Sequence, residues 1–333
     1  MKTEPQGDRT PHHDATRIHG APHFRRFSFE QTLEDLEQAV RWIEGHGRSV
    51  DPTRIGRYRK DLRRAIEQLA SGELKALFKS GDDAEKGKVF AAILTSQYEV
   101  GEFISIYNGL KTLAASVDQH KLRALLSGPI SYLDEAPSSA AARNTAFELI
   151  VAARLGEIGL KPALVPPADI LVPFRSTQLV VECKRPQNLG SVEGNIEDAF
   201  GQLRERYGTT PTPSLRGIAA IDVTKAVNPN FHRLRAASLA DLDAQLGGAL
   251  ETFARKYGGS WLSKAPPGTI GVLLRISMIG ELQDSQLPVY TQNYLFISLA
   301  RPGSLDNEVT RELYGLMLRP PVWKRQGPRE SLV

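Results

Sequence analysis

The stretch that decides the fold runs from Ala168 to Pro186 and reads ADILVPFRSTQLVVECKRP. Two apolar runs flank Phe174–Thr177, which predicts two strands joined by a tight turn around Arg175–Ser176. With those two residues as the loop, the numbers of cross-strand partners sum to 351, so Asp169 faces Glu182 on one side of the sheet. Directly opposed residues have Cβ atoms only about 5 Å apart. The hairpin therefore gathers two like charges that repel each other unless a cation lies between them.

This pair of acids predicts a metal site at the end of the second strand. Two converging carboxylates supply hard oxygen ligands for Mg²⁺ or Mn²⁺. Because side chains alternate along a strand, Lys184 projects from the same face as Glu182, whereas Cys183 points to the opposite face. A lysine beside two acids can orient and activate a water that attacks phosphorus, or stabilise charge on phosphate oxygens. A plain ion-pair cluster at the sheet edge is the alternative interpretation.

Glu-x-Lys by itself carries little information. The chain contains a second copy, Glu73-Leu74-Lys75, on an expected helix with no acid on a neighbouring strand. The complete hairpin is more specific, because it requires an acid, two apolar strands, a turn and Glu-x-Lys in register.

Helical periodicities and short apolar runs follow one another from residue 138 onward. Mixed elements in this order predict an α/β sandwich, with helices on both faces of one sheet. The expected helices are 140–159, 195–207 and 239–257, and the expected strands are 163–165, 169–172, 179–183, 217–223, 270–279 and 290–299.

The preceding part is predicted to be an all-helical domain over residues 27–137, ending at the Pro/Ser segment EAPSS. Phe27–Ile43 is amphipathic, with apolar residues at spacings of three and four. A second helix is expected to run to about Leu69, with Asp51 as its N-cap and Pro52 in its first turn. Further helices are expected over 84–113 and 117–133.

The two ends of the chain are expected to be tails. Residues 1–26 hold four of the seven histidines among Gly and Pro, which indicates a disordered polar tail; a metal-binding tract is the alternative. With three histidines left for the folded part, a multi-histidine metal centre is not expected. Residues 319–333 are expected to form a basic C-terminal tail.

Composition limits the class of protein. The chain has 333 residues and a formal net charge of +4, with 41% hydrophobic and 24% charged residues, which excludes wholesale disorder. The single cysteine, Cys183, excludes a disulfide scaffold, and with no secretory leader we expect a cytoplasmic protein. The strongest apolar stretch, 268–279, contains Arg275 and is too short to span a bilayer, so no membrane association is expected. All of the excess positive charge lies in residues 138–333, which favours a polyanionic partner there.

In these motifs the chain resembles the PD-(D/E)XK, or restriction-endonuclease-like, nuclease superfamily. The core of that family is a helix, a sheet centred on a β-hairpin, and flanking helices. The acid before the hairpin corresponds to Asp169, and Glu-x-Lys corresponds to Glu182 and Lys184. The resemblance further implies a metal ligand at Glu148 on the preceding helix and a site glutamine at Gln202 on the following helix.

The resemblance covers residues 140–223 well and 239–299 loosely, and it does not extend to residues 1–137. Ala168 stands where the family usually has a proline, which contacts no metal. Some branches carry a tyrosine four positions after the glutamine; Arg206 occupies that place here, which argues against membership of those branches.

The resemblance implies a Mg²⁺-dependent endonuclease that hydrolyses DNA phosphodiester bonds, in defence against foreign DNA or in repair. Asp169 and Glu182 are expected to bind Mg²⁺, which Mn²⁺ can replace, together with Glu148 and the backbone carbonyl of Cys183. Lys184 is expected to position or deprotonate the attacking water. Gln202 is expected to steady that water or Lys184. Two alternatives stay open: a non-catalytic nucleic-acid- or protein-binding module on the same fold, and an RNA-cleaving enzyme.

Two of these residues have simpler interpretations. Glu148 could instead pair with Arg143 or Arg154 on its own helix or be solvated, and Gln202 could be an ordinary surface glutamine. Both interpretations leave the Asp169–Glu182 pair unaffected.

Basic residues outside the motif are candidate contacts to duplex or branched DNA. They are Arg54, Arg57, Lys60 and Arg64 on one expected helix, and Arg185 next to the motif lysine. Because Asp61 and Glu67 lie close by, a solvated helix face is the alternative. The helical domain over 27–137 is also the expected surface for a homodimer contact or a protein partner.

Overall fold

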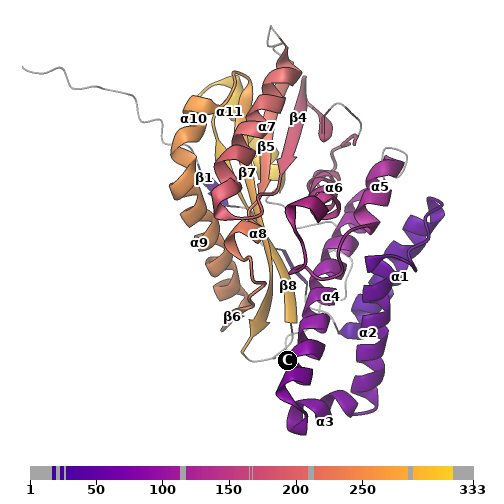
Figure 1. Cartoon of the computed structure of the whole chain (residues 1–333). Coiled ribbons are helices and arrows are strands. Elements are labelled where there is room, and N and C mark those ends of the chain that lie inside the picture. Colours follow the sequence, from indigo (N-terminus) through magenta and orange to yellow (C-terminus); the bar gives the residue numbers. More distant parts are fainter. Residues whose placement is uncertain are drawn as a thin grey trace, which may run out of the picture.

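Figure 1 shows the computed structural model of the chain, which describes residues 17–19, 23–25, 28–112, 118–164, 166, 168–208, 214–283 and 288–317. The described part is a mixed α/β structure, with a curled mixed sheet flanked by helices and preceded by a helical N-terminal region. The expected α/β class is confirmed at this level. Within the described ranges, no helix is long and apolar enough to cross a membrane.

The described strands form one mixed sheet. Its order is β1-β8-β7-β5-β4-β3, with β2 paired to β8 and β6 paired to β7. β4, β5 and β7 are parallel, while β3 and β8 are antiparallel to their neighbours. The strands are β1 (Arg17–His19), β2 (His23–Arg25), β3 (Ile170–Phe174), β4 (Thr177–Lys184), β5 (Leu215–Asp222), β6 (Leu234–Ala236), β7 (Thr269–Leu282) and β8 (Pro288–Ser298).

The hairpin of β3 and β4 has the predicted register. Ile170 pairs with Val181 and Phe174 with Thr177, so the partner numbers sum to 351. Arg175 adopts a left-handed conformation, with φ of 53°. Positive φ in a two-residue loop matches the twist of the flanking strands. One step beyond the first pair, this register places Asp169 opposite Glu182.

Helices cover both faces of this sheet, as expected (Figure 1). Leu179, Val181 and Cys183 pack among α1, α2, α4, α5, α6 and α11, whereas Val180 faces α7, α9 and α10. The alternation along β4 therefore assigns each side chain to a face. The helices are α1 (Phe29–Gly45), α2 (Arg54–Ala70), α3 (Glu73–Ser80), α4 (Asp83–Leu110), α5 (Gln119–Leu126), α6 (Ala141–Glu157), α7 (Val192–Tyr207), α8 (Thr224–Val227), α9 (Leu239–Tyr257), α10 (Trp261–Lys264) and α11 (Leu305–Met317).

The N-terminal helices differ from expectation at their ends. The N-cap of α2 is Thr53, whose hydroxyl accepts from the Gly56 amide at 3.4 Å, and not Asp51. Pro52 therefore precedes the cap and lies outside the first turn. The expected helix over 117–133 ends at Leu126, because Gly128 has a φ of +89° and a proline follows it. α5 is consequently short and is followed by a loop.

The six residues of β1 and β2 lie in the segment expected to be a disordered tail, and they pair with β8 instead. Residues 319–333, expected to be a basic tail, lie outside the described residues.

The helical region and the sheet share one hydrophobic core. Residues of α1, α2 and α4 belong to the same buried cluster as those of α6 and β4. A buried ion-pair network joins three of these helices: Glu99 of α4 binds Arg54 of α2, and accepts from Arg143 of α6 at 2.7 Å. Arg54 also donates to the Leu125 carbonyl of α5 at 3.0 Å. The helical region is thereby held firmly against the site-bearing part of the sheet.

Candidate active site

The predicted acids meet at the carboxyl end of β4. An Asp169 carboxylate oxygen accepts a hydrogen bond from the Cys183 amide at 2.8 Å, so this side chain lies against β4 beside Glu182. Glu182 is buried, whereas Asp169 is partly exposed. The hairpin register therefore produces the expected juxtaposition.

Glu182 lies in an unusual electrostatic environment. Burial, and next the negative charge of Asp169, raise the pKa of Glu182 to about 7. Arg206 opposes this shift, because its Nε donates to a Glu182 carboxylate oxygen at 3.1 Å. The rise shows that Arg206 alone does not offset burial and repulsion together.

Lys184 projects from the same face as Glu182, toward α7. Its Nζ donates to the Gln202 side-chain oxygen at 2.6 Å, and both side chains are partly exposed. Gln202 is therefore in direct contact with the motif lysine. Such a contact fixes the position of the ammonium group beside the two acids.

Glu148 of α6 joins the group from the other face of the sheet. Burial, and next the charge of Asp169, raise its pKa, while its ion pair with Lys121 acts in the opposite direction. Lys121 belongs to α5 and also lies 3.4 Å from the Asp169 carbonyl oxygen. Glu148 thus pairs with Lys121, while the two arginines considered as alternative partners, Arg143 and Arg154, bind Glu99 and Glu157.

Sequence reasoning missed the roles of Lys121 and Arg206. Arg206 was visible as the departure from the tyrosine of some family branches, four residues after Gln202 on the same helix face. Lys121 gave no comparable signal, because it meets Glu148 only through the packing of α5 on α6. Sequence spacing can indicate that Arg206 lies near Gln202 on one helix. It cannot indicate a contact such as Lys121 with Glu148, which depends on how two helices pack.

Cys183 faces the helices on the opposite side of β4. The residue is 8% exposed, and burial raises the pKa of its thiol well above the ordinary value for cysteine. The negative charges of Asp169 and Glu148 act in the same direction. A protonated, buried thiol is a poor nucleophile. The side chain of Cys183 therefore serves packing.

The five basic residues predicted to contact DNA lie in different environments. Arg54 is buried in the network with Glu99, and Arg185 is buried against Glu135. Lys60 and Arg64 are exposed on α2, and the exposed Arg57 pairs with Asp61 at 3.1 Å. The exposed positions are accessible to a polyanion, whereas the buried ones hold the core together.

The carboxylate oxygens of the three acids are suitable ligands for a divalent ion. Two of the acids, Glu148 and Glu182, already form ion pairs with Lys121 and Arg206. Carboxylate oxygens of Glu148, Asp169 and Glu182 are the ligand type that Mg²⁺ prefers. The charge of Asp169 raises the pKa of both other acids, so Asp169 is close enough to repel each of them. Within the described ranges, no three acidic, histidine or cysteine side chains are already arranged as a metal centre.

Comparison with known proteins identifies no family or function for the residues of this site. A scan against protein-family models, a search of curated proteins and a search of solved structures each found no match.

Proposed function

We propose that the chain is a metal-dependent endonuclease that hydrolyses DNA phosphodiester bonds on a restriction-endonuclease-like core. The observation that carries the proposal is the contact of Asp169 with β4 beside Glu182, with Lys184 on the same face. A protein selected only for stability gains nothing from two repelling acids in a partly buried position. A divalent ion bound between Asp169 and Glu182 would turn this repulsion into a shared attraction.

The order of elements supports the core assignment. α6 precedes the hairpin, β3 and β4 carry the acids, and α7 follows with Gln202. A bridge between Ala163 and Leu171 adds a further pairing on the outer side of β3. These elements occur in the order that the family resemblance implies, with the acids at the end of β4.

Each side chain has a role in this proposal. Asp169 and Glu182 would hold Mg²⁺, with Glu148 and the Cys183 carbonyl completing the shell. A bound Mg²⁺ supplies a water of lowered pKa and neutralises charge on the scissile phosphate. The Lys184 ammonium would position that water and donate to phosphate oxygens in the transition state. Gln202 fixes the Lys184 ammonium through its 2.6 Å hydrogen bond.

The two cations that sequence reasoning missed have a place in the same scheme. Lys121 and Arg206 pair with Glu148 and Glu182. If the carboxylates held a metal, Lys121 and Arg206 would contribute positive charge for the phosphate group of the substrate. Phosphates are commonly bound by lysine and arginine.

The test is an assay of purified protein with Mg²⁺ or Mn²⁺ on duplex, single-stranded and branched DNA. Cleavage is expected with metal and is expected to disappear in EDTA and in Asp169→Ala and Lys184→Ala. The matched control is Lys75→Ala, which alters the exposed second Glu-x-Lys on α3 and should retain full activity. Unchanged cleavage in Asp169→Ala would overturn the assignment. An RNA competitor added to the same reaction separates DNA from RNA as substrate.

A non-catalytic binding module is the second candidate. The ion pairs of Lys121 with Glu148 and of Arg206 with Glu182 favour it, because they give the acids partners without a metal. This function predicts DNA binding that needs no divalent ion and that persists in Asp169→Ala. Binding of the same DNA substrates in EDTA, measured beside the cleavage assay for wild type and Asp169→Ala, distinguishes the two functions.

A further inference from the structure

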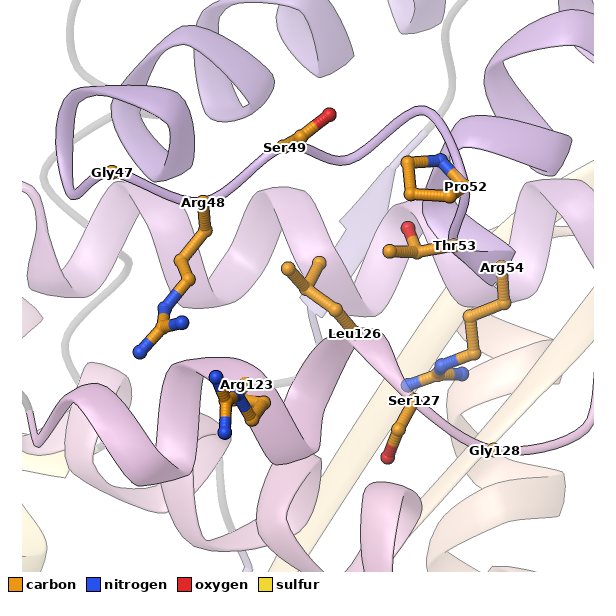
Figure 2. Close-up of a pocket in the computed structure, with 10 residues that line it drawn as sticks. All are labelled: Gly47, Arg48, Ser49, Pro52, Thr53, Arg54, Arg123, Leu126, Ser127 and Gly128. Carbon is orange, nitrogen blue, oxygen red and sulfur yellow. The ribbon is translucent and has the colours of Figure 1, made fainter.

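A second charged region lies in the helical part of the molecule, outside the acidic site. A cavity of about 560 Å³ opens between the loop after α1, the start of α2 and the end of α5 (Figure 2). Its volume lies within the range of pockets that bind small molecules. It is lined by Gly47, Arg48, Ser49, Pro52, Thr53, Arg54, Arg123, Leu126, Ser127 and Gly128.

The lining is cationic and contains no acid. Figure 2 shows the side chains of Arg48 and Arg123 extending into the same space, from the loop after α1 and from α5. Neither forms an ion pair with any carboxylate of the described residues. The Arg48 Nε is buried and has no hydrogen-bond partner there either. A buried guanidinium N–H without an acceptor costs free energy, so the described residues leave the Arg48 guanidinium unsatisfied.

The remaining groups suit a phosphate. Ser49 contributes a hydroxyl, whereas the Thr53 and Ser127 hydroxyls already donate to the Val50 and Ala124 carbonyls at 2.6 and 2.7 Å. No atom lies within 4 Å of the position that a Cβ would take at Gly47, so a ligand can approach the backbone there. Thr53 is the N-cap of α2, so the positive end of the helix dipole lies at the cavity wall. Arg54 is already used, because its guanidinium binds Glu99 and the Leu125 carbonyl. The arginines left for a ligand are therefore Arg48 and Arg123.

Beside the polar groups lie Pro52 and Leu126, which offer apolar surface. The cavity is also larger than a single phosphate requires. A sugar and base attached to the phosphate would occupy the remaining volume. These features together favour a nucleotide phosphate over a bare inorganic anion.

We propose that this cavity binds the phosphate group of a nucleotide, either free or within a nucleic-acid strand, with Arg48 and Arg123 as its guanidinium ligands. The proposal does not depend on nuclease activity, since none of the proposed catalytic residues lines the cavity. α5 nevertheless connects the two regions, because it carries Arg123 on one side and Lys121, the partner of Glu148, on another.

The first arm of the test measures free nucleotide by calorimetry in EDTA, with dAMP as probe and deoxyadenosine as the matched compound without phosphate. Wild-type protein is expected to bind dAMP, and Arg48→Ala and Arg123→Ala should each weaken binding about tenfold, the loss typical of a charge-assisted hydrogen bond. Arg255→Ala, on the exposed side of α9 across the sheet, is the control and should bind normally.

The second arm measures a fluorescent single strand of DNA in EDTA, by anisotropy, with the same variants. Weaker strand binding in Arg48→Ala and Arg123→Ala identifies a strand phosphate as the source, and dAMP binding without strand binding identifies a free nucleotide. Arg48→Lys and Arg123→Lys keep the charge and should recover part of the affinity. Equal binding of deoxyadenosine and dAMP, or normal binding of both dAMP and the strand in the two alanine variants, would overturn the proposal.

Discussion

Two charged regions on either side of α5 differ in what neutralises them. The acidic site holds Glu148, Asp169 and Glu182, and engages two of them with Lys121 and Arg206. The arginine cavity holds Arg48 and Arg123 without a carboxylate partner among the described residues. In the first region cationic side chains of the chain pair with two of the acids, and in the second no carboxylate among the described residues pairs with the two arginines. The two proposals accordingly differ: the first region would bind a cation, and the second would bind an anion.

A third charged cluster shows what a structural network looks like. Glu99 is buried between Arg54 and Arg143, and its pKa is lowered by both arginines in spite of burial. Glu182 has one arginine, and its pKa is raised. The direction of the shift therefore differs between a carboxylate held by two arginines and one that burial and a second carboxylate destabilise.

The largest expected effect concerns that structural network. Glu99→Ala leaves two buried arginines uncompensated, and we expect a loss of about 3–5 kcal/mol in the free energy of unfolding. Urea unfolding measures it. Asp61→Ala, which removes the half-buried partner of the exposed Arg57, is the control and should cost less than about 1 kcal/mol. Equal losses in the two variants would erase the distinction between buried and exposed pairs.

The next effect concerns catalysis. Lys184→Ala removes the ammonium group proposed to act on the water and the phosphate, and we expect a fall in kcat of about 10²–10³-fold. Steady-state cleavage of a labelled duplex in Mg²⁺ measures it. Gln202→Ala leaves the lysine in place without its 2.6 Å partner and should produce a smaller fall. A larger loss in Gln202→Ala than in Lys184→Ala contradicts the assigned roles.

A smaller effect concerns stability without metal. The pKa of Glu182 is about 7 in the folded protein, above the ordinary value of 4.5, so the folded state binds the proton more tightly than the unfolded state. This group therefore removes stability as pH rises from about 4.5 to above 7, by at most roughly 3 kcal/mol.

Glu182→Gln should accordingly be more stable than wild type at pH 8 and not at pH 5, when both are unfolded in EDTA. Thermal unfolding at pH 5, 6, 7 and 8 measures the difference between the two proteins. A difference in stability that does not change with pH would show that the pKa of Glu182 is not raised in the folded state. Added Mn²⁺ should stabilise wild type more than the variant.

The smallest effect concerns the exposed basic residues of α2. Arg64→Ala and Lys60→Ala should weaken DNA binding only a few-fold if these side chains touch phosphates. Each should also lower the slope of log affinity against log salt by about one. Titrations at several salt concentrations measure it. An unchanged slope assigns the residues to a solvated helix face.

The hairpin could be predicted because its determinants are local. A two-residue loop and alternation of period two fix the register, so Asp169 and Glu182 could be paired by counting. The same alternation assigned Lys184 to the face of α7 and Cys183 to the core. α9 begins at Leu239 and ends at Tyr257, as its periodicity predicts.

Contacts between distant segments could not be predicted in this way. The packing of α5 on the other helices brings Lys121 to Glu148. The same packing places Arg123 beside Arg48 in the lining of one cavity. The helix predicted over 117–133 is also too long, because the helical sequence pattern continues past Gly128 whereas α5 ends at Leu126. The helix cap at Thr53 was missed because both Asp51 and Thr53 are good cap residues, and only the final backbone decides between them.

The most direct test of the central claim is anomalous diffraction from crystals soaked in Mn²⁺, with wild type and Asp169→Ala compared. We predict one strong peak between the carboxylates of Asp169 and Glu182 in the wild type, and its loss in the variant. Contradiction would be a soaked wild-type crystal with no peak there, and with Glu182 still bound to Arg206.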